Sequence, residues 1–131
     1  MKFEDLVGKT IQSISGATEG GKAIVITLTS GEEYVMYHEQ DCCESVNIND
    51  IEGDIEDLIG TPITMAEEAR NCEDLFEKGP VDPDEYEQRS FTWTFYRLAT
   101  VRGYVTIRWF GESNGYYSES VTFCPKSEAY Y

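Results

Sequence analysis

The segment YHEQDCCESV, residues 37–46, gathers most of the side chains in this sequence that could do chemistry. It contains the only histidine of the chain and five groups of interest: His38, Asp41, Cys42, Cys43 and Glu44. Imidazole, thiolate and carboxylate groups are the ordinary protein ligands of zinc. A cysteine beside a histidine can also act as a nucleophile, with a carboxylate to orient the base. The segment therefore has three interpretations: a metal site, a catalytic centre or a structural turn.

The spacing of the segment argues against a metal site. Adjacent residues on a strand point to opposite faces, so Cys42 and Cys43 would not ordinarily approach one ion together. No C-x₂-C pair occurs elsewhere in the chain. The acidic segment NINDIEGDIED also lacks the alternating oxygen donors that an EF-hand places before its glycine. We therefore predict no bound metal and no cofactor.

Catalysis by a Cys–His pair is also disfavoured, because nothing else in the chain suggests an oxyanion hole or a phosphate cradle. We predict that the protein is not an enzyme. In the favoured interpretation the segment is a strand-to-turn element, in which Asp41 bonds nearby backbone amides and His38 pairs with a carboxylate. Its polar side chains could also line a ligand site. A metal-binding protein or Cys/His enzyme centred on residues 38–44 stays as an alternative.

A second group of candidate residues lies in RWFGESNGYYSES, residues 108–120. Aromatic rings, a guanidinium and an amide at the end of a sheet are typical of a pocket for a nucleotide-like ligand or for a partner's side chains. Together with the polar groups of the first segment, the candidate pocket comprises His38, Asp41, Glu44, Arg108, Trp109, Asn114, Tyr116 and Tyr117. The alternative is a tyrosine-rich hairpin that packs on its own sheet, since strands favour aromatic residues.

The elements that must position these residues are mostly strands. Hydrophobic alternation and glycine-rich turns predict strands at 10–15, 23–28, about 32–38, 90–100 and 104–110, an extended segment near 62–69, and a last strand ending at Phe123. Along SFTWTFYRLAT, for example, Phe91, Trp93 and Phe95 alternate with Thr92, Thr94, Tyr96 and Leu98. Short helices are expected at 3–7 and within 49–60, where Ile51, Ile55, Leu58 and Ile59 have helical spacing. The second of these helices is expected to be interrupted or to begin at Gly53.

The expected fold is a single α+β domain over residues 1–131, mainly antiparallel β, with six to seven strands and one or two short helices. A chain of 131 residues can bury a core by itself. Residues 71–89 are rich in acids and contain two prolines, which predicts a surface loop that is either mobile or ordered only by a partner. No stretch approaches the roughly 20 apolar residues of a membrane span, and no secretory signal is visible at the start. We therefore expect a soluble, intracellular protein whose four cysteines are thiols.

Charge is concentrated in one region of the chain. The net charge is −15, and residues 44–87 contain fifteen acidic and two basic residues, a net charge of −13. Such a field repels nucleic acid and favours a basic protein surface as the partner, although an acidic surface can also serve solubility alone. The predicted partner-binding residues are Glu52, Asp54, Glu56, Asp57, Glu67, Glu68, Glu73, Asp74, Glu77, Asp82, Asp84 and Glu85.

Three segments of the chain carry a resemblance to a known family: YHEQDCCESV, IEGDIEDLIGTPITMAEE and FTWTFYRLATVRGYVTIRWFGESNGYYSESV. They resemble a family of small uncharacterised bacteriophage proteins, for which the string Tyr-His-x-Gln-Asp-Cys-Cys-Glu is specific. The likeness covers about residues 5–123, and the acidic loop at 71–89 is the part least tied to it. It implies a phage origin and the host-cell cytoplasm, and it places no activity on particular residues.

Two binding functions follow as hypotheses. In the first, a phage accessory protein inhibits a host defence or nucleic-acid enzyme by presenting acids where phosphates would lie, as an anti-CRISPR-like nucleic-acid mimic. In the second, the protein sequesters a small signalling nucleotide in the candidate pocket, between protomers if it forms a homo-oligomer. Neither hypothesis involves direct binding of nucleic acid or a membrane.

Overall fold

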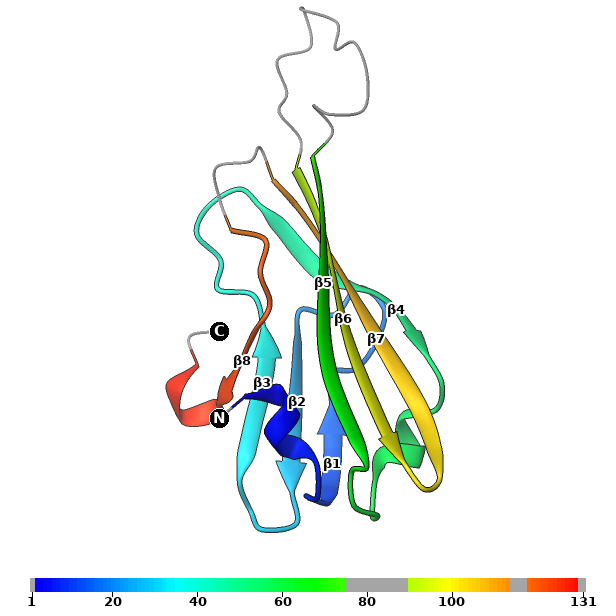
Figure 1. Cartoon of the computed structure of the whole chain (residues 1–131). Helices are drawn as coiled ribbons and strands as arrows, with labels where there is room; N and C mark the ends of the chain where they lie inside the picture. Colours follow the sequence, from blue (N-terminus) through cyan, green and yellow to red (C-terminus); the bar gives the residue numbers. More distant parts are fainter. Residues whose placement is uncertain (1, 75–89, 114–117, 130–131) are drawn as a thin grey trace, which may run out of the picture.

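The computed structural model describes residues 2–74, 90–113 and 118–129, and its strands form two antiparallel sheets that face each other (Figure 1). The first sheet has the spatial order β1-β2-β3-β8 and consists of β1 (Ile11–Ser15), β2 (Ala23–Leu28), β3 (Glu33–Tyr37) and β8 (Thr122–Pro125). The second has the order β4-β7-β6-β5 and consists of β4 (Ser45–Glu52), β5 (Met65–Asp74), β6 (Ser90–Thr100) and β7 (Gly103–Ser113). The mainly antiparallel fold class is confirmed, with eight strands in the described residues rather than six or seven.

The hydrophobic core lies between the two sheets. Its largest contributors are Ile24, Ile26, Leu28, Tyr34 and Met36 from the first sheet and Val46, Ile48, Tyr96, Leu98, Val105, Ile107 and Trp109 from the second, each at most 7% exposed. The 3-10 helix η1 (Phe3–Leu6) adds two buried residues, and its Phe3 ring packs edge-on against Tyr96 at 4.7 Å between ring centroids. A short helix at the start of the chain is thus confirmed, in the 3-10 form.

The short helix expected within residues 49–60, interrupted or begun at Gly53, is present only after that glycine and in the 3-10 form. β4 continues to Glu52, and the four-residue 3-10 helix η2 (Ile55–Leu58) follows Gly53. Between them Gly53 has φ +102, a conformation that side chains disfavour, and the chain changes direction there. The helical spacing of the isoleucines spans this glycine, so it combined residues of a strand with residues of the next turn.

The predicted start of the acidic loop at residue 71 is wrong, because residues 71–74 belong to a strand. β5 extends to Asp74 and pairs with β6 in an unbroken register from Met65 opposite Ala99 to Asp74 opposite Ser90. The rest of that loop, residues 75–89, lies outside the described residues.

The hairpin of β6 and β7 sets which side chains face the core. A two-residue turn at 101–102 places Thr100 opposite Gly103, and the register continues without a shift to Ser90 opposite Ser113. The predicted alternation is confirmed: Thr92, Thr94, Tyr96 and Leu98 are buried, whereas Phe91, Trp93 and Phe95 are half-buried on the outward face. The strand expected near Phe123 is also present, as β8, and it joins the first sheet beside β3.

The chain crosses from the first sheet to the second between β3 and β4, through residues 38–44, and this crossing lies at one end of the sandwich (Figure 1). A second link joins the sheets at β4, where Ile48 exchanges backbone hydrogen bonds with Gly20 and Gly21 at 2.7 and 2.8 Å. None of the helices in the described part of the chain has the length and apolar character that crossing a membrane requires.

Candidate functional site

The segment 38–44 is a loop organised around one buried carboxylate. Glu44 has a fully buried side chain that accepts hydrogen bonds on both oxygens. Oε1 accepts from the Gln40 amide nitrogen at 2.9 Å and from the Cys42 backbone N–H at 2.8 Å, and Oε2 accepts from the Asp41 backbone N–H at 3.1 Å. The carboxylate that binds the loop amides is thus Glu44 and not Asp41, whose side chain is exposed. The sequence predicted the type of contact but assigned it to the wrong residue.

His38 joins this loop to the other end of the chain. Its ring is only 4% exposed, with Nε2 at 2.9 Å from Glu44 Oε2 and Nδ1 at 2.6 Å from the Ser120 carbonyl oxygen. The predicted pairing of His38 with a carboxylate is therefore present. The two contacts hold the ring between a backbone carbonyl and a carboxylate. The pair connects β3, the crossing loop and the segment before β8.

Opposing effects set the acidity of Glu44. Burial alone would raise the pKa of its carboxyl group, because the charged form loses its hydration. The hydrogen bonds from the Cys42 amide, the His38 ring and the Asp41 amide outweigh burial and lower the pKa to about 2, from an ordinary value of 4.5. Glu44 is consequently ionised across the physiological range and has its acceptor positions filled by its own loop.

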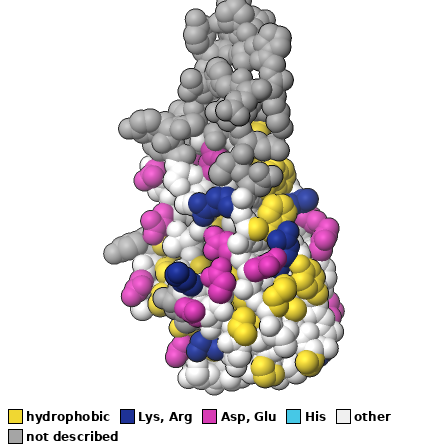
Figure 2. All heavy atoms as spheres, viewed as in Figure 1, with side chains coloured by type: hydrophobic (Ala, Val, Ile, Leu, Met, Phe, Trp, Pro, Cys, Tyr) yellow, Lys and Arg dark blue, Asp and Glu magenta, His cyan; other side chains and the backbone are white. Residues whose placement is uncertain are grey.

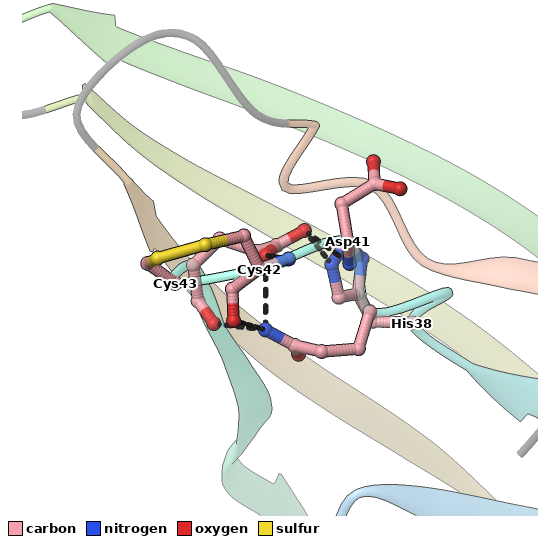
Figure 3. Close-up of a disulfide and its surroundings, with 6 residues drawn as sticks. His38, Asp41, Cys42 and Cys43 are labelled. Carbon is pink, nitrogen blue, oxygen red and sulfur yellow. Dashed lines mark hydrogen bonds and ion pairs between the residues drawn. A yellow bond between two sulfur atoms is a disulfide. The ribbon is translucent and has the colours of Figure 1, made fainter.

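The two adjacent cysteines form a disulfide, Cys42–Cys43, on the exposed side of this loop (Figure 3). The expectation that the cysteines are thiols is wrong for this pair, whereas Cys124 is a free thiol. Among the described residues no three His, Cys, Asp or Glu side chains are grouped as metal ligands would be. In this arrangement Cys42 offers neither a thiolate ligand nor a nucleophile, and the loop has the architecture of a structural turn.

A hollow of about 520 Å³ opens beside this loop. It is lined by Lys22, Ala23, Tyr37, His38, Gln40, Glu44, Ser45 and Val46. Three of the predicted pocket residues fall near it, since His38 and Glu44 line it and Asp41 belongs to the same loop. Their hydrogen bonds are directed at one another, so the polar groups here already have partners inside the protein.

Of the other half of the predicted pocket, the structure describes only Arg108 and Trp109, and it does not bring these two side chains together. Arg108 and Trp109 are neighbours on β7 and point to opposite faces, Trp109 into the core with 0% exposure and Arg108 outward. They cannot line one site together. Asn114, Tyr116 and Tyr117 lie outside the described residues.

The outward face of the second sheet carries a row of aromatic side chains, which sequence reasoning did not identify as a surface. On β6 and β7 these are Phe91, Trp93, Phe95, Tyr104 and Phe110. The Phe110 ring lies 4.5 Å from Trp93 and 5.4 Å from Phe91, measured between centroids. Figure 2 shows hydrophobic side chains interleaved with basic and acidic ones on this side of the molecule. Alternation along β7 could have found this face, because its inward residues Val105, Ile107 and Trp109 are more apolar than its outward ones and the hairpin register then fixes the face of β6.

Two arginines are stacked on that aromatic row. The Arg108 guanidinium lies over the Trp93 ring at 5.2 Å and donates two hydrogen bonds, of 3.0 and 2.7 Å, to Asn49 Oδ1. The Arg97 guanidinium lies over the Phe95 ring at 5.3 Å and pairs with Glu67 at 3.0 Å. These contacts hold the aromatic rings and the guanidinium planes in fixed positions across the sheet.

The predicted acidic residues do not all share one face. Glu52, Asp54 and Glu56 are exposed together where β4 ends and η2 begins, and Asp57 beside them is half-buried. Glu67 faces outward, whereas Glu68 lies on the opposite face of β5. Burial raises the pKa of the Glu68 carboxyl group; the positive charge of Arg70 lowers this pKa, and the negative charge of Glu4 raises it further. Glu73 and Asp74 belong to β5, and Glu77, Asp82, Asp84 and Glu85 lie outside the described residues.

These observations define the class of protein as an antiparallel β-sandwich with an aromatic outer face bordered by acids. The chain belongs to the family described as Domain of unknown function (DUF7448), which matches residues 4–123. Comparison with curated proteins and with solved structures gives no match.

Proposed function

We propose that this protein is a binding protein that docks through the outward face of its second sheet onto a basic surface of a partner protein. The observation that carries the proposal is the aromatic row on β6 and β7, which the described elements leave partly exposed. Aromatic and arginine side chains are enriched at the energetic centres of protein interfaces. A row of this kind on a monomer's surface is typical of an interaction site.

Charge supports the choice of a basic partner. Acids border the aromatic row on two sides, with Asp50 and Glu52 on β4 and Glu67 on β5, and the chain as a whole carries −15. A field of this sign repels phosphates and accelerates association with a positively charged protein surface. The two outward arginines do not reverse this field, because a carboxylate lies beside each of them, Glu67 at 3.0 Å from Arg97 and Asp50 at 3.8 Å from Arg108.

The biological role that fits this surface is inhibition. A basic surface that normally binds nucleic acid would be covered by acids standing where phosphates would lie. The resemblance to small phage proteins supports a setting in the host-cell cytoplasm, with a defence protein or a nucleic-acid enzyme of the host as the target. Glu52, Asp54 and Glu56 serve this purpose because they are exposed together where β4 ends and η2 begins.

The other functions considered from the sequence have less support. A nucleotide-sequestering pocket loses its main wall, since Trp109 is in the core and Arg108 is on the other face. An enzyme centred on His38 and Cys42 would need groups that the loop already uses for its own hydrogen bonds and disulfide.

A fragment-display selection tests the proposal. Protein fragments of a bacterial genome are displayed on yeast and selected for binding to the full chain. We expect the enriched fragments to be basic and to lose affinity for Trp93→Ala by at least about tenfold, the effect of a hot-spot residue. Val101→Ala is the matched control, because Val101 is 82% exposed at the tip of the same hairpin and off the aromatic row. Enrichment of neutral or acidic fragments, or equal affinity for both variants, would overturn the proposal.

A further inference from the structure

A hollow of about 310 Å³ lies at one end of the aromatic face, and its shape follows from the sheet register. Thr106 on β7 forms the floor, with Glu52 on β4 opposite it on one side and Arg97 on β6 on the other. Tyr104 and Arg108, two positions away along β7, form the end walls. A small residue surrounded by four long side chains leaves a recess in the sheet surface.

The charged groups around this recess are not equally available to a ligand. Arg97 is paired with Glu67 and Arg108 with the Asn49 side chain, so each guanidinium already has a polar partner. Asp50 lies 3.8 Å from Arg108, which makes a loose ion pair. Glu52 has neither an ion pair nor a side-chain hydrogen bond with any residue in the described ranges 2–74, 90–113 and 118–129. The charged group of the recess that is left to pair with a ligand is therefore the Glu52 carboxylate.

The apolar lining of the recess fits a side chain with a long stem. Phe95 lines one wall, and the Tyr104 ring is 50% exposed at another. Lysine and arginine side chains bury an aliphatic stem along apolar surface while their charged head seeks an acid or a ring face. The volume is at the lower end of the range for small-molecule pockets, which suits one side chain rather than a cofactor.

We propose that this recess receives a single arginine or lysine side chain of the partner, with its stem between Phe95 and Tyr104 and its charge at Glu52. The proposal rests on the proposed function and specifies the chemistry that the partner must present at one point of the interface. Charge complementarity selects this occupant over an anionic ligand, because the two arginines that line the recess among the described residues are already paired and Glu52 would repel an anion.

The test uses defined peptides rather than a partner protein. Backbone amide spectra of the ¹⁵N-labelled full chain are recorded while acetyl-Gly-Gly-Arg-Gly-Gly-amide is added, and the series is repeated with lysine, with the neutral isostere citrulline, and with glutamate in place of arginine. We expect saturable shifts at Tyr104, Thr106 and Glu52 with the two cationic peptides only. Glu52→Gln should weaken the affinity about two- to fivefold, the range for an exposed charge pair.

Two further variants sharpen the result. Glu19→Gln removes an exposed acid between β1 and β2 that does not line the recess, and it should leave the affinity unchanged. Thr106→Leu fills the floor and should abolish the shifts. The proposal is overturned if citrulline or glutamate peptides bind as well as arginine, if Glu52→Gln and Glu19→Gln behave alike, or if the shifts fall outside the recess. In that event, loss of fragment binding by Trp93→Ala would still support the aromatic face, so the two proposals fail separately.

Discussion

Glu44 determines the local structure of the crossing loop. Its side chain is fully buried, and His38, Gln40 and two backbone amides donate to it. Glu44→Ala should lower the free energy of unfolding by about 3–5 kcal/mol, because the imidazole and the amides would lose their acceptor in a buried setting. Urea denaturation measures the change. Asp41→Ala in the same loop is the control, with an exposed side chain and an expected change within about 0.5 kcal/mol. Equal effects would show that the carboxylate does not organise the loop.

The low pKa of Glu44 gives a prediction about pH. Its pKa is about 2 in the folded protein against an ordinary 4.5, so its contribution to stability is complete above pH 4.5 and is lost as the pH falls towards 2. Glu44→Gln cannot take up this proton. Between pH 4.5 and 2 the unfolding free energy of the wild type should therefore fall more steeply than that of the variant, by one proton in the linkage slope. Parallel curves of unfolding free energy against pH for the two proteins would contradict the low pKa of Glu44.

At the scale of elements, the β6–β7 hairpin separates the two tryptophans of the chain onto opposite faces. Trp109 is inside and fully buried, and Trp93 is outside and half-buried. In Trp93→Phe the remaining tryptophan fluorescence should resist quenching by acrylamide, whereas in Trp109→Phe it should be quenched readily. A reversed order would mean that the hairpin presents its other face to the core.

Two glycines with positive φ, Gly53 before η2 and Gly60 after it, allow a matched comparison of alanine substitutions. A Cβ at Gly53 would lie 2.3 Å from the Tyr104 carbonyl oxygen, whereas a Cβ at Gly60 would meet nothing within 4 Å. Both have unfavourable φ for alanine, at +102 and +90. Gly60→Ala should destabilise by roughly 1 kcal/mol through backbone strain alone, and Gly53→Ala by clearly more, since the clash adds to the strain. Thermal unfolding of both variants decides; similar melting temperatures would contradict the packing of β4 against β7.

The sequence predicted strands well where alternation is regular and turns are short. AIVITL and SFTWTFYRLAT coincide with β2 and β6 because a period of two and flanking turn residues are local properties. Within 49–60 a helical turn forms only after Gly53, because the residues before that glycine pair with β7 as the end of β4. The division into two sheets could not be predicted, since it depends on which distant strands pair, as β8 does with β3.

The candidate site was predicted in part for similar reasons. Hydrogen bonds within YHEQDCCESV could be predicted, because they join polar residues that are close in the sequence. The interpretation of the segment as a structural turn agrees with the contacts of Glu44 and His38. The aromatic face was missed because Phe91, Trp93 and Phe95 are more apolar than Thr92 and Thr94, yet the threonines face inward. That choice is set by the partner strand, whose Val105, Ile107 and Trp109 must be buried, and therefore by register rather than by local hydrophobicity.

At the scale of the whole molecule, the net charge of −15 should control binding of the basic partner. Raising the salt from about 50 to 500 mM should weaken the affinity for the selected fragment, because screening shortens the range of the acidic field. The combined variant Glu52→Gln, Asp54→Asn, Glu56→Gln should show a shallower dependence on salt. Affinities measured by calorimetry at several salt concentrations test this, and an unchanged slope would show that these acids do not face the partner.

The most direct measurement of the central claim is the footprint of the selected fragment on the protein, mapped by cross-saturation of backbone amides in the ²H,¹⁵N-labelled chain. Binding through the outward sheet face predicts saturation transfer at Trp93, Phe95, Thr106 and Phe110. Transfer confined to the crossing loop and the hollow beside Lys22 and Gln40, or to the first sheet, would contradict it.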